Sequence, residues 1–218
     1  MKTIEYFYSA HSAYAYIGHL RLLEICSSHG CELVHKPIDL RPVVRAVGSL
    51  PFDRRTQHNV DYHFGREIER WAQFRNIAIL SHRPTYHDRQ LDFSNGILIA
   101  GINGSADIDA LSYAILQAHW RDDADLEDPD QMRKVATNLN PEYGKFVDIA
   151  LSEEVQRIHS SNTNEAIERG IFGSPTYFLD GDMYYGQDHL ELMEYAISQP
   201  FGPFNFLNPK PGDPRLEK

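Results

Sequence analysis

A strand-like pattern passes directly into a helix-like pattern within the first thirty residues. Residues 3–8 (TIEYFY) are rich in β-branched and aromatic side chains, as is typical of a strand. From Ser12 onward apolar positions recur at helical spacing, and Gly30 is the residue type that commonly follows a helix. These apolar positions are Tyr16, Leu20, Leu23 and Ile25. The pattern predicts a strand, a short loop and a helix that begins at or near Ser12.

A second strand-like segment lies far along the chain, directly after a proline. Residues 176–179 (TYFL) follow Pro175. Proline has no N–H for a sheet ladder, so it is tolerated at the start of a strand where the preceding main chain turns. The Ser174–Pro175 bond can be cis at a cost of only about 0.5–1 kcal/mol, and a cis bond turns the main chain of residue 174 toward a ligand. The alternative is a trans proline that begins an ordinary strand.

The middle of the chain is mostly helical in pattern. Amphipathic spacing predicts helices at 59–75, 106–120, 130–139 and 141–151, with a loop at 83–92. The chain is therefore predicted to be an α/β protein with strands near its two ends, in 1–42 and 163–200, a helical region at 43–162 between them and an extended C-terminal tail at 201–218.

The expected tail is too apolar for a purely solvated linker. Its apolar residues are Phe201, Phe204, Phe206 and Leu207. The tail is expected to pack either across its own subunit or against a second copy, and the sequence leaves both arrangements open.

Charge and composition exclude several classes of function. The formal net charge of −10 disfavours nucleic-acid binding, which needs an excess of lysine and arginine. The N-terminus shows no long apolar signal region, and no stretch approaches the roughly 18 apolar residues that cross a bilayer. We therefore expect a cytoplasmic protein that binds neither nucleic acid nor membrane.

The cysteines and histidines do not form a redox or metal motif. The two cysteines, Cys26 and Cys31, lie near the end of the first helix and beyond it, and no Cys-x-x-Cys pair stands at its start. We expect both to be structural thiols. Among the histidines, the spacings do not give a convincing metal site.

Ser12 is the residue whose position suggests chemistry. A helix N-terminus has unpaired N–H groups and a dipole that favour an anion or a thiolate. The alternative is that Ser12 is only the helix N-cap, a position at which serine is favoured. His11 is adjacent, but neighbouring residues on a turn point apart and no acidic partner is identifiable, so a serine-hydrolase arrangement is weakly supported.

Three motifs resemble one branch of the thioredoxin-like superfamily. They are Phe7–Tyr16, Glu165–Tyr177 and Tyr184–Leu192. This is the DsbA-like branch that contains 2-hydroxychromene-2-carboxylate isomerases and kappa-class glutathione transferases, and the resemblance covers most of residues 1–195. The second motif matches the family nearly letter for letter. In the first, Ala13 stands where the family usually has proline.

The resemblance implies a thioredoxin-like fold with an inserted helical domain, and glutathione as the cosubstrate. Ser12 matches the family's active serine, whose hydroxyl donates to the glutathione sulfur and holds it as thiolate. Ser174 and Pro175 match the main-chain site for the cysteinyl part, and the match to this ligand-facing loop implies that the Ser174–Pro175 bond is cis. Asp188 matches the aspartate that receives the γ-glutamyl ammonium, and Gln187 the residue that contacts the adjacent carboxylate. Asp188 also suits a cap of the last helix.

Further contacts are expected from less specific positions. Arg54 stands in the stretch where the family has glutathione- or substrate-binding residues, and its guanidinium suits a carboxylate. A solvated arginine is the alternative. His11 and Tyr14, which flank Ser12, are expected in the substrate pocket.

The implied function is glutathione-dependent cis–trans isomerisation of a small aromatic-catabolism intermediate of the 2-hydroxychromene-2-carboxylate type. Thiolate addition to a conjugated carbon turns a double bond into a rotatable single bond, and elimination releases the isomer. A kappa-like glutathione transferase that conjugates electrophiles is the nearest alternative. A non-catalytic thioredoxin-like protein that binds peptides or assists folding is a third. The family also implies a homodimer.

Overall fold

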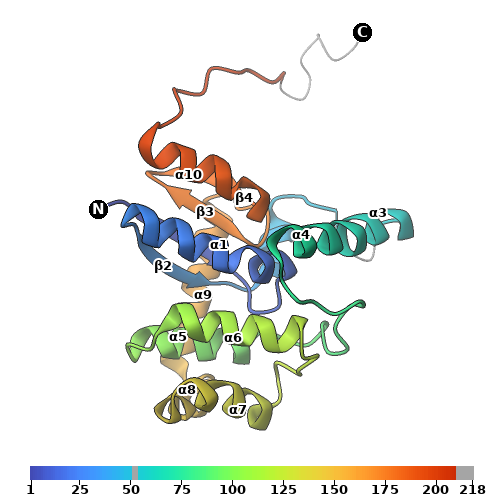
Figure 1. The fold of residues 1–218 in the computed structure, drawn as a ribbon, viewed down its shortest axis with the longest axis vertical. Coiled ribbons are helices and arrows are strands. Elements are labelled where there is room, and N and C mark those ends of the chain that lie inside the picture. Colours follow the sequence, from blue (N-terminus) through green and yellow to red (C-terminus); the bar gives the residue numbers. More distant parts are fainter. Residues whose placement is uncertain (51–53, 210–218) are drawn as a thin grey trace.

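A mixed sheet of four strands lies at the centre of the part of the chain that the computed structural model describes, residues 1–50 and 54–209. The strand order is β2-β1-β3-β4 (Figure 1). β1 pairs in parallel with β2 and antiparallel with β3, and β3 pairs antiparallel with β4. The strands are β1 Thr3–Tyr8, β2 Glu32–Pro37, β3 Thr176–Leu179 and β4 Asp182–Tyr185. The two ends of the chain therefore meet in one sheet, as predicted.

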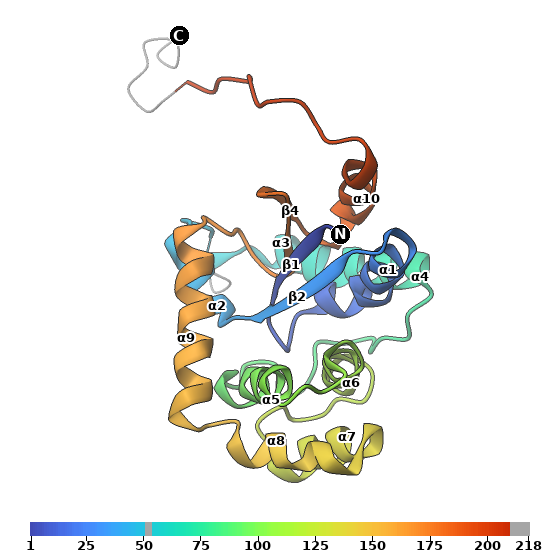
Figure 2. The ribbon, with the colours of Figure 1, turned by 90° about the vertical axis from the view of Figure 1, so that its left-hand side faces the viewer.

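Helices cover both faces of this sheet. α1 and α10 lie on one side of the strands, and α9 and α2 lie on the other (Figure 2). The bounds are α1 Ala13–His29, α2 Leu40–Ala46, α9 Glu153–Glu168 and α10 Leu190–Ser198, with the 3-10 turn η4 Gln187–His189 before α10. α1 is the crossover that a parallel β1–β2 pair requires.

The start and end of α1 are those predicted. Ser12 is its N-cap, and Gly30 follows it with φ 63°, a backbone conformation that glycine adopts without strain. The predicted apolar stripe was only partly right, because Leu20 is 44% exposed. Ile17 and Leu22 are buried instead, so the buried face of α1 is rotated from the one expected.

β1 is buried on both faces. Tyr6 and Tyr8 point into the core that contains α1, whereas Phe7 packs with Ile38 and Phe178 on the other face. All three β1 aromatics are fully buried, and each such side chain stabilises the fold by roughly 1.5–3 kcal/mol. The strand that leads to Ser12 is therefore held rigidly.

The inserted region is helical, with boundaries that differ from the prediction. The stretch predicted as one helix at 59–75 is α3 Gln57–Asp61, the π-helical turn η2 Tyr62–Arg66 and α4 Glu67–Arg75. The stretch predicted at 141–151 is the 3-10 turn η3 Pro141–Tyr143 followed by α8 Gly144–Ile149. The remaining helices are α5 Asp92–Asn103, α6 Ile108–Trp120 and α7 Pro129–Leu139.

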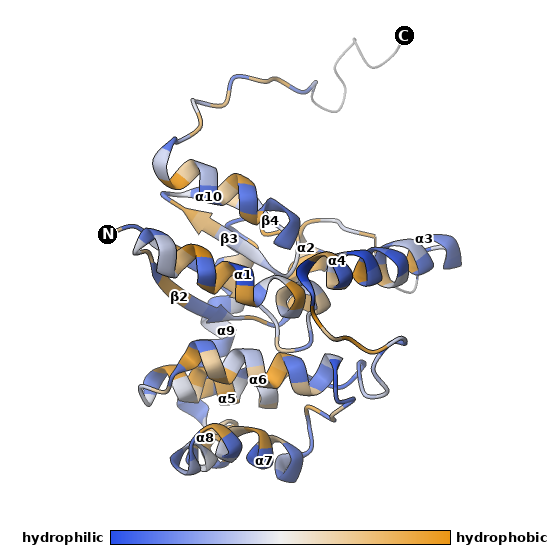
Figure 3. Ribbon diagram, in the orientation of Figure 1, coloured by the Kyte–Doolittle hydropathy of each residue, from blue (hydrophilic) through white to orange (hydrophobic). Residues whose placement is uncertain are grey.

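α5 has no counterpart in the sequence-based prediction. Residues 94–101 are all buried, including the polar Ser94 and Asn95, so the helix is covered on nearly every side. Apolar residues, orange in Figure 3, alternate in it with polar ones. A helix that is covered all round carries no amphipathic stripe for a periodicity argument to detect.

The helices are arranged as two groups around the sheet. α5 to α8 form a layer below the strands, and α3 and α4 project beside α1 (Figure 1). α9 runs from the lower layer up along the sheet (Figure 2). It is continuous across the expected domain boundary at residue 162, so the chain returns to the sheet within a single helix.

Residues 201–209 extend away from the rest of the chain (Figures 1 and 2). Phe201 contacts its own chain, with its ring centre 5.5 Å from that of Tyr195, whereas Phe204 and Phe206 are 83% and 70% exposed and do not pack across it. Residues 210–218 of the expected tail lie outside the described residues. A homodimer stays a prediction. No helix in residues 1–50 and 54–209 is long and apolar enough to cross a membrane.

Candidate active site

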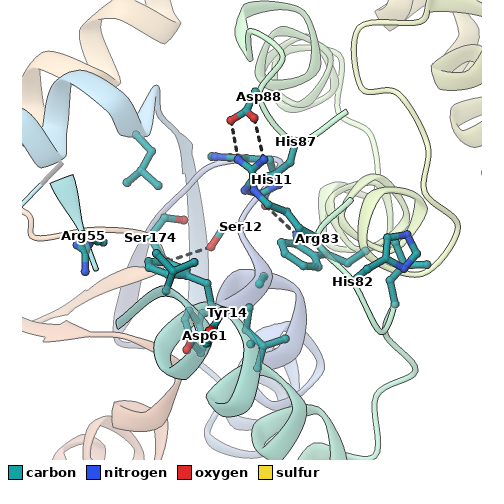
Figure 4. A pocket seen from close by; sticks show the side chains of 18 of the residues that line it. His11, Ser12, Tyr14, Arg55, Asp61, His82, Arg83, His87, Asp88 and Ser174 are labelled. Atoms are coloured by element: carbon teal, nitrogen blue, oxygen red, sulfur yellow. Dashed lines mark hydrogen bonds and ion pairs between the residues drawn. The ribbon is translucent and has the colours of Figure 1, made fainter. Parts of the chain in front are cut away.

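A cavity of about 590 Å³ opens at the N-terminus of α1. Its walls come from the loop before α1, from α2, from the α3–α4 arm and from the loop before α5 (Figure 4). Its polar lining includes His11, Ser12, Tyr14, Arg41, Arg55, Arg83, His87, Asp88 and Ser174. Four predicted site residues, His11, Ser12, Tyr14 and Ser174, therefore meet at one cavity.

The Ser12 hydroxyl makes two hydrogen bonds. It accepts from the backbone N–H of Ala15 at 3.2 Å, which is the N-cap bond of α1, and it donates to the carbonyl oxygen of Ser174 at 3.0 Å. The N-cap interpretation of Ser12 is therefore correct, and it is compatible with a chemical role. The same hydroxyl caps the N-terminus of α1 and points toward Ser174, which lies just before β3 (Figure 4).

The loop before Ser12 is fastened to the helical insertion. The amide of Asn95 in α5 accepts from the N–H of Ala10 at 3.0 Å and donates to the carbonyl of Ile38 at 2.9 Å. The indole N–H of Trp120 in α6 donates to the carbonyl of His11 at 2.7 Å. These side chains are buried, so the insertion fixes the backbone on which Ser12 stands.

The Ser174–Pro175 bond is cis, as predicted. The hydroxyl of Ser174 accepts from the N–H of Ser9 at 3.0 Å. The side chain of Ser174 therefore holds the β3 end against the loop before α1, while its carbonyl oxygen is the group that meets Ser12.

Gln187 and Asp188 do not line the cavity, but Asp188 lies close enough to Tyr14 to add to the raised pKa that burial gives this side chain. Gln187 is fully buried, and its Oε1 accepts from Arg75 at 3.3 Å. It packs so closely on α1 that a Cβ atom at Gly18 would lie 2.5 Å from the Gln187 Cβ. The side chain of Gln187 is therefore a packing and hydrogen-bonding element between η4, α1 and α4.

Asp188 presents its carboxylate at the surface. Its side chain is 51% exposed, and the nearest cationic group is the ring of His189, whose Nδ1 lies 3.6 Å from Asp188 Oδ2. The interpretation of Asp188 as a helix cap was wrong, because neither η4 nor α10 has a side-chain cap, and the residues that precede them are Gly186 and His189.

Arginines line the cavity at positions that the sequence analysis did not select. Within the described part of the chain, Arg54 is exposed and does not line the cavity, whereas Arg55 does. Arg41, at the start of α2, also lines it and donates to the backbone carbonyls of Asp88 and Arg89. Among residues 1–50 and 54–209, no carboxylate forms an ion pair with Arg41 or Arg55.

His11 and Tyr14 are at the cavity, as predicted. The His11 Nδ1 lies 3.0 Å from the Ser9 hydroxyl, and burial lowers the pKa of His11 well below its ordinary value, with His87 adding to the effect. The Tyr14 hydroxyl donates to the carbonyl of His63 in η2. Burial raises the pKa of Tyr14, so both side chains are neutral groups of the wall.

Two further histidines extend the wall beyond His11. The ring of His87 lies 4.7 Å from that of His11, centre to centre, and its Nδ1 lies 3.0 Å from Nε2 of His119. These residues come from three separate segments, and no spacing in the sequence connects them. Of His87 and His119, only the buried His119 lies in a segment predicted as a helix, 106–120, which is α6 in the structure.

Thiol and metal chemistry are not supplied by the described residues themselves. Cys26 is buried, which raises its pKa to about 12, and Cys31 lies beyond the C-terminus of α1. In residues 1–50 and 54–209, no group of three or more His, Cys, Asp or Glu side chains is arranged to hold a metal ion.

The fold and this site define the class of protein. The family model of the DSBA-like thioredoxin domain matches residues 3–198, so the chain belongs to this family and the predicted thioredoxin-like fold with a helical insertion is confirmed. Its first helix carries Ser12 and Ala15 where a Cys-x-x-Cys motif of that fold would place its thiols.

The relatives that the chain resembles are isomerases. A 2-hydroxychromene-2-carboxylate isomerase of Pseudomonas sp. (strain C18) is 27% identical over 197 residues, which cover 89% of each chain. The isomerase of the same name from Pseudomonas putida is 26% identical over 201 residues, which cover 90% of this chain and 94% of the relative. A solved structure of a 2-hydroxychromene-2-carboxylate isomerase has a TM-score of 0.77 at 24% identity, with 90% of this chain and 95% of that chain covered. The resemblance inferred from the three motifs is confirmed.

Proposed function

We propose that this protein is an isomerase that uses glutathione as cosubstrate and acts on an aromatic compound of the 2-hydroxychromene-2-carboxylate type. The observation that carries the proposal is the position of the Ser12 hydroxyl, which stands at the N-terminus of α1, lines the cavity and lies 3.0 Å from the Ser174 carbonyl oxygen. The similarity to 2-hydroxychromene-2-carboxylate isomerases over about nine-tenths of the chain supports the choice of reaction.

The residues around Ser12 fit a thiol tripeptide. The helix N-terminus favours a thiolate, and the Ser174 carbonyl is an acceptor for a peptide N–H. The exposed Asp188 carboxylate suits an ammonium group. When bound, glutathione supplies a thiolate that adds to a conjugated carbon, which lets the adjacent bond rotate before the thiolate leaves.

Ser12 has one hydroxyl proton, and its present acceptor is the Ser174 carbonyl. If an N–H group of the ligand donates to the Ser174 carbonyl oxygen, this oxygen no longer depends on Ser12 for a hydrogen bond. The Ser12 proton is then available to an anion at the end of α1, while its lone pair still caps the helix through Ala15. Ser12 thus stabilises negative charge without leaving any buried polar group unpaired.

Two arginines of the cavity lining suit an anionic group of the substrate. Acidic side chains line the cavity too, namely Asp61, Glu69 and Asp88, but none of the described carboxylates forms an ion pair with Arg41 or Arg55. The guanidinium of Arg41 is already oriented by two backbone carbonyls. A guanidinium in this position matches a substrate that carries a carboxylate.

The test is an absorbance assay with 2-hydroxychromene-2-carboxylate in the presence and absence of glutathione, together with calorimetric titration of glutathione. We expect glutathione to bind, the assay to show isomerisation only when it is present, and the product to have the mass of the substrate. A product whose mass includes glutathione would indicate a transferase. Failure to bind glutathione would contradict the proposal.

A further inference from the structure

We propose that His87 is a specificity-determining hydrogen-bond acceptor, held in one tautomer so that its Nε2 recognises a hydroxyl group of the substrate. This inference deepens the proposed function and rests on it for the identity of the substrate. It follows from a row of hydrogen bonds that begins at a backbone carbonyl behind the cavity.

The row begins at Ala124. Its carbonyl oxygen can only accept, and it lies 3.2 Å from Nδ1 of His119, so this nitrogen carries the proton. His119 is fully buried, and burial lowers its pKa, which keeps the ring neutral. A neutral imidazole with a proton on Nδ1 has a lone pair on Nε2.

The same logic then fixes His87. Its Nδ1 lies 3.0 Å from the Nε2 lone pair of His119, so the Nδ1 of His87 carries the proton. Burial, with the neighbouring His119, lowers the pKa of His87 to about 3, so its ring is neutral too. Its Nε2 must therefore be an acceptor, and among the described residues this atom has no partner.

The ring of His87 is also fixed in space at the cavity wall. Its centre lies 4.7 Å from that of the His11 ring, which precedes Ser12 and is tilted by 35° against it, and 5.3 Å from that of Trp120 in an edge-to-face contact. His11, Ser12 and His87 all line the cavity (Figure 4). A ligand held at Ser12 therefore lies beside a rigid acceptor that cannot become a donor at neutral pH.

An obligate acceptor selects for a donor. A carboxylate or ketone oxygen gains nothing from Nε2 of His87, whereas a hydroxyl group donates to it. The carboxylate of the substrate is then directed to the arginines and the hydroxyl to His87, so these groups together fix the orientation of the ring. Sites built around a substrate hydroxyl discriminate strongly against analogues that lack it.

The tautomer is tested directly by ¹⁵N–¹H NMR of histidine-labelled protein without ligand. We expect pyrrole-type Nδ1 and pyridine-type Nε2 signals for both His87 and His119, assigned with His87→Gln and His119→Gln variants. An Nε2–H tautomer for His87, or a doubly protonated ring at neutral pH, overturns the inference.

Selectivity is tested by calorimetry with 2-hydroxycinnamate and 2-fluorocinnamate, which are nearly equal in size but differ in the proton to donate. The wild-type protein should bind the hydroxy compound about threefold to tenfold more tightly, the value of one hydrogen bond. His87→Phe should lose the preference, and His87→Gln, which keeps an acceptor, should restore part of it. An unchanged preference in His87→Phe contradicts the inference.

The NMR measurement is made on the wild-type protein and uses variants only to assign the signals. Binding of the two cinnamates requires neither glutathione nor catalysis. The inference and the proposed function therefore fail separately. A hydroxyl preference that depends on His87 in a protein without isomerase activity would contradict the function alone.

Discussion

The two sides of the cavity differ in what fixes their polar groups. On the sheet side, Ser12 and Ser174 are positioned by backbone elements, the first turn of α1 and the start of β3. On the side formed by α2 and the inserted region, called the insertion side here, Arg41 and His87 are positioned by loop carbonyls and by other side chains. The first side presents what a thioredoxin-like fold offers to a thiol. The second presents groups particular to this chain, where substrate choice is expected to arise.

The largest effect is expected from Ser12→Ala, which breaks the sheet side. The variant loses the donor to an anion at the end of α1, and removal of one such donor lowers turnover by about 10²–10³. Steady-state kinetics on a verified substrate measures this. Because the variant also loses the Ala15 cap, its free energy of unfolding should fall by about 1 kcal/mol.

Ser12→Gly is the matched control, since glycine caps nearly as well as serine but has no hydroxyl. It should be almost as stable as the wild-type protein and as inactive as Ser12→Ala. Full activity in either variant would show that the Ser12 hydroxyl has no part in the reaction.

The next effect tests whether the sheet side extends to the exposed carboxylate of Asp188. Asp188→Asn keeps the size of the side chain but removes the charge that would pair with an ammonium group. Glutathione binding should weaken by roughly 1.5–3 kcal/mol, about ten- to a hundredfold, by calorimetry. The melting temperature without ligand should hardly change, because Asp188 caps neither η4 nor α10.

Asp130→Asn, at an exposed position at the start of α7, is the control for a general change of charge. If Asp188→Asn binds glutathione as tightly as this control does, the ammonium site lies elsewhere.

A smaller effect is expected from Arg41→Gln, which breaks the insertion side. Loss of one charged partner should raise the dissociation constant of 2-hydroxycinnamate about tenfold, while glutathione binding should be unaffected. Arg45→Gln, an exposed residue of the same helix that does not line the cavity within the described residues, should change neither. Equal effects of the two variants would remove Arg41 from the substrate site.

The smallest effect, counted for each titrating histidine, is the loss of folding stability that we expect when the pH is lowered. The pKa of the buried His19 is lowered to about 4 and that of His87 to about 3, chiefly by burial, and the pKa values of His11 and His119 are lowered too. Unfolded histidines titrate near 6.5. Below that pH the unfolded state binds more protons, so the stability that neutral burial provides is present above about pH 6.5 and is lost as the pH falls toward the folded pKa values.

Each such histidine should contribute on the order of 1 kcal/mol of lost stability per pH unit in this range. Urea unfolding at a series of pH values between 7 and about 4.5 measures the slope. The slope should be smaller in His87→Gln, because one titrating group of the insertion side is gone. An unfolding free energy that does not change with pH over this range would contradict neutral burial of these rings.

The prediction from sequence succeeded where local chemistry decides the structure. The strand before Ser12, the start and end of α1 and the helix that ends at Trp120 all follow from residue types at short spacing, whereas the cis bond before Pro175 was predicted from the resemblance to a family. It did not find α5, because burial on all sides removes the periodic signal. It also selected Arg54, which is exposed, whereas the next residue, Arg55, is the one that lines the cavity.

By itself, the sequence determined the strand, the loop and the helix around Ser12, because caps, turns and amphipathic stripes are interactions between near neighbours, and the resemblance of its motifs to a family pointed to the thioredoxin-like framework. Only the tertiary structure decided which side chains face Ser12. Arg41 follows β2, His87 lies in the loop before α5 and His119 lies in α6, and they come together through packing between segments that are far apart in the chain. Hydrogen-bond partners also decide which ring nitrogen carries the proton. The backbone carbonyl of Ala124 fixes it on His119, and His119 fixes it on His87. No pattern of spacing records such an arrangement, since it exists only when the chain is folded.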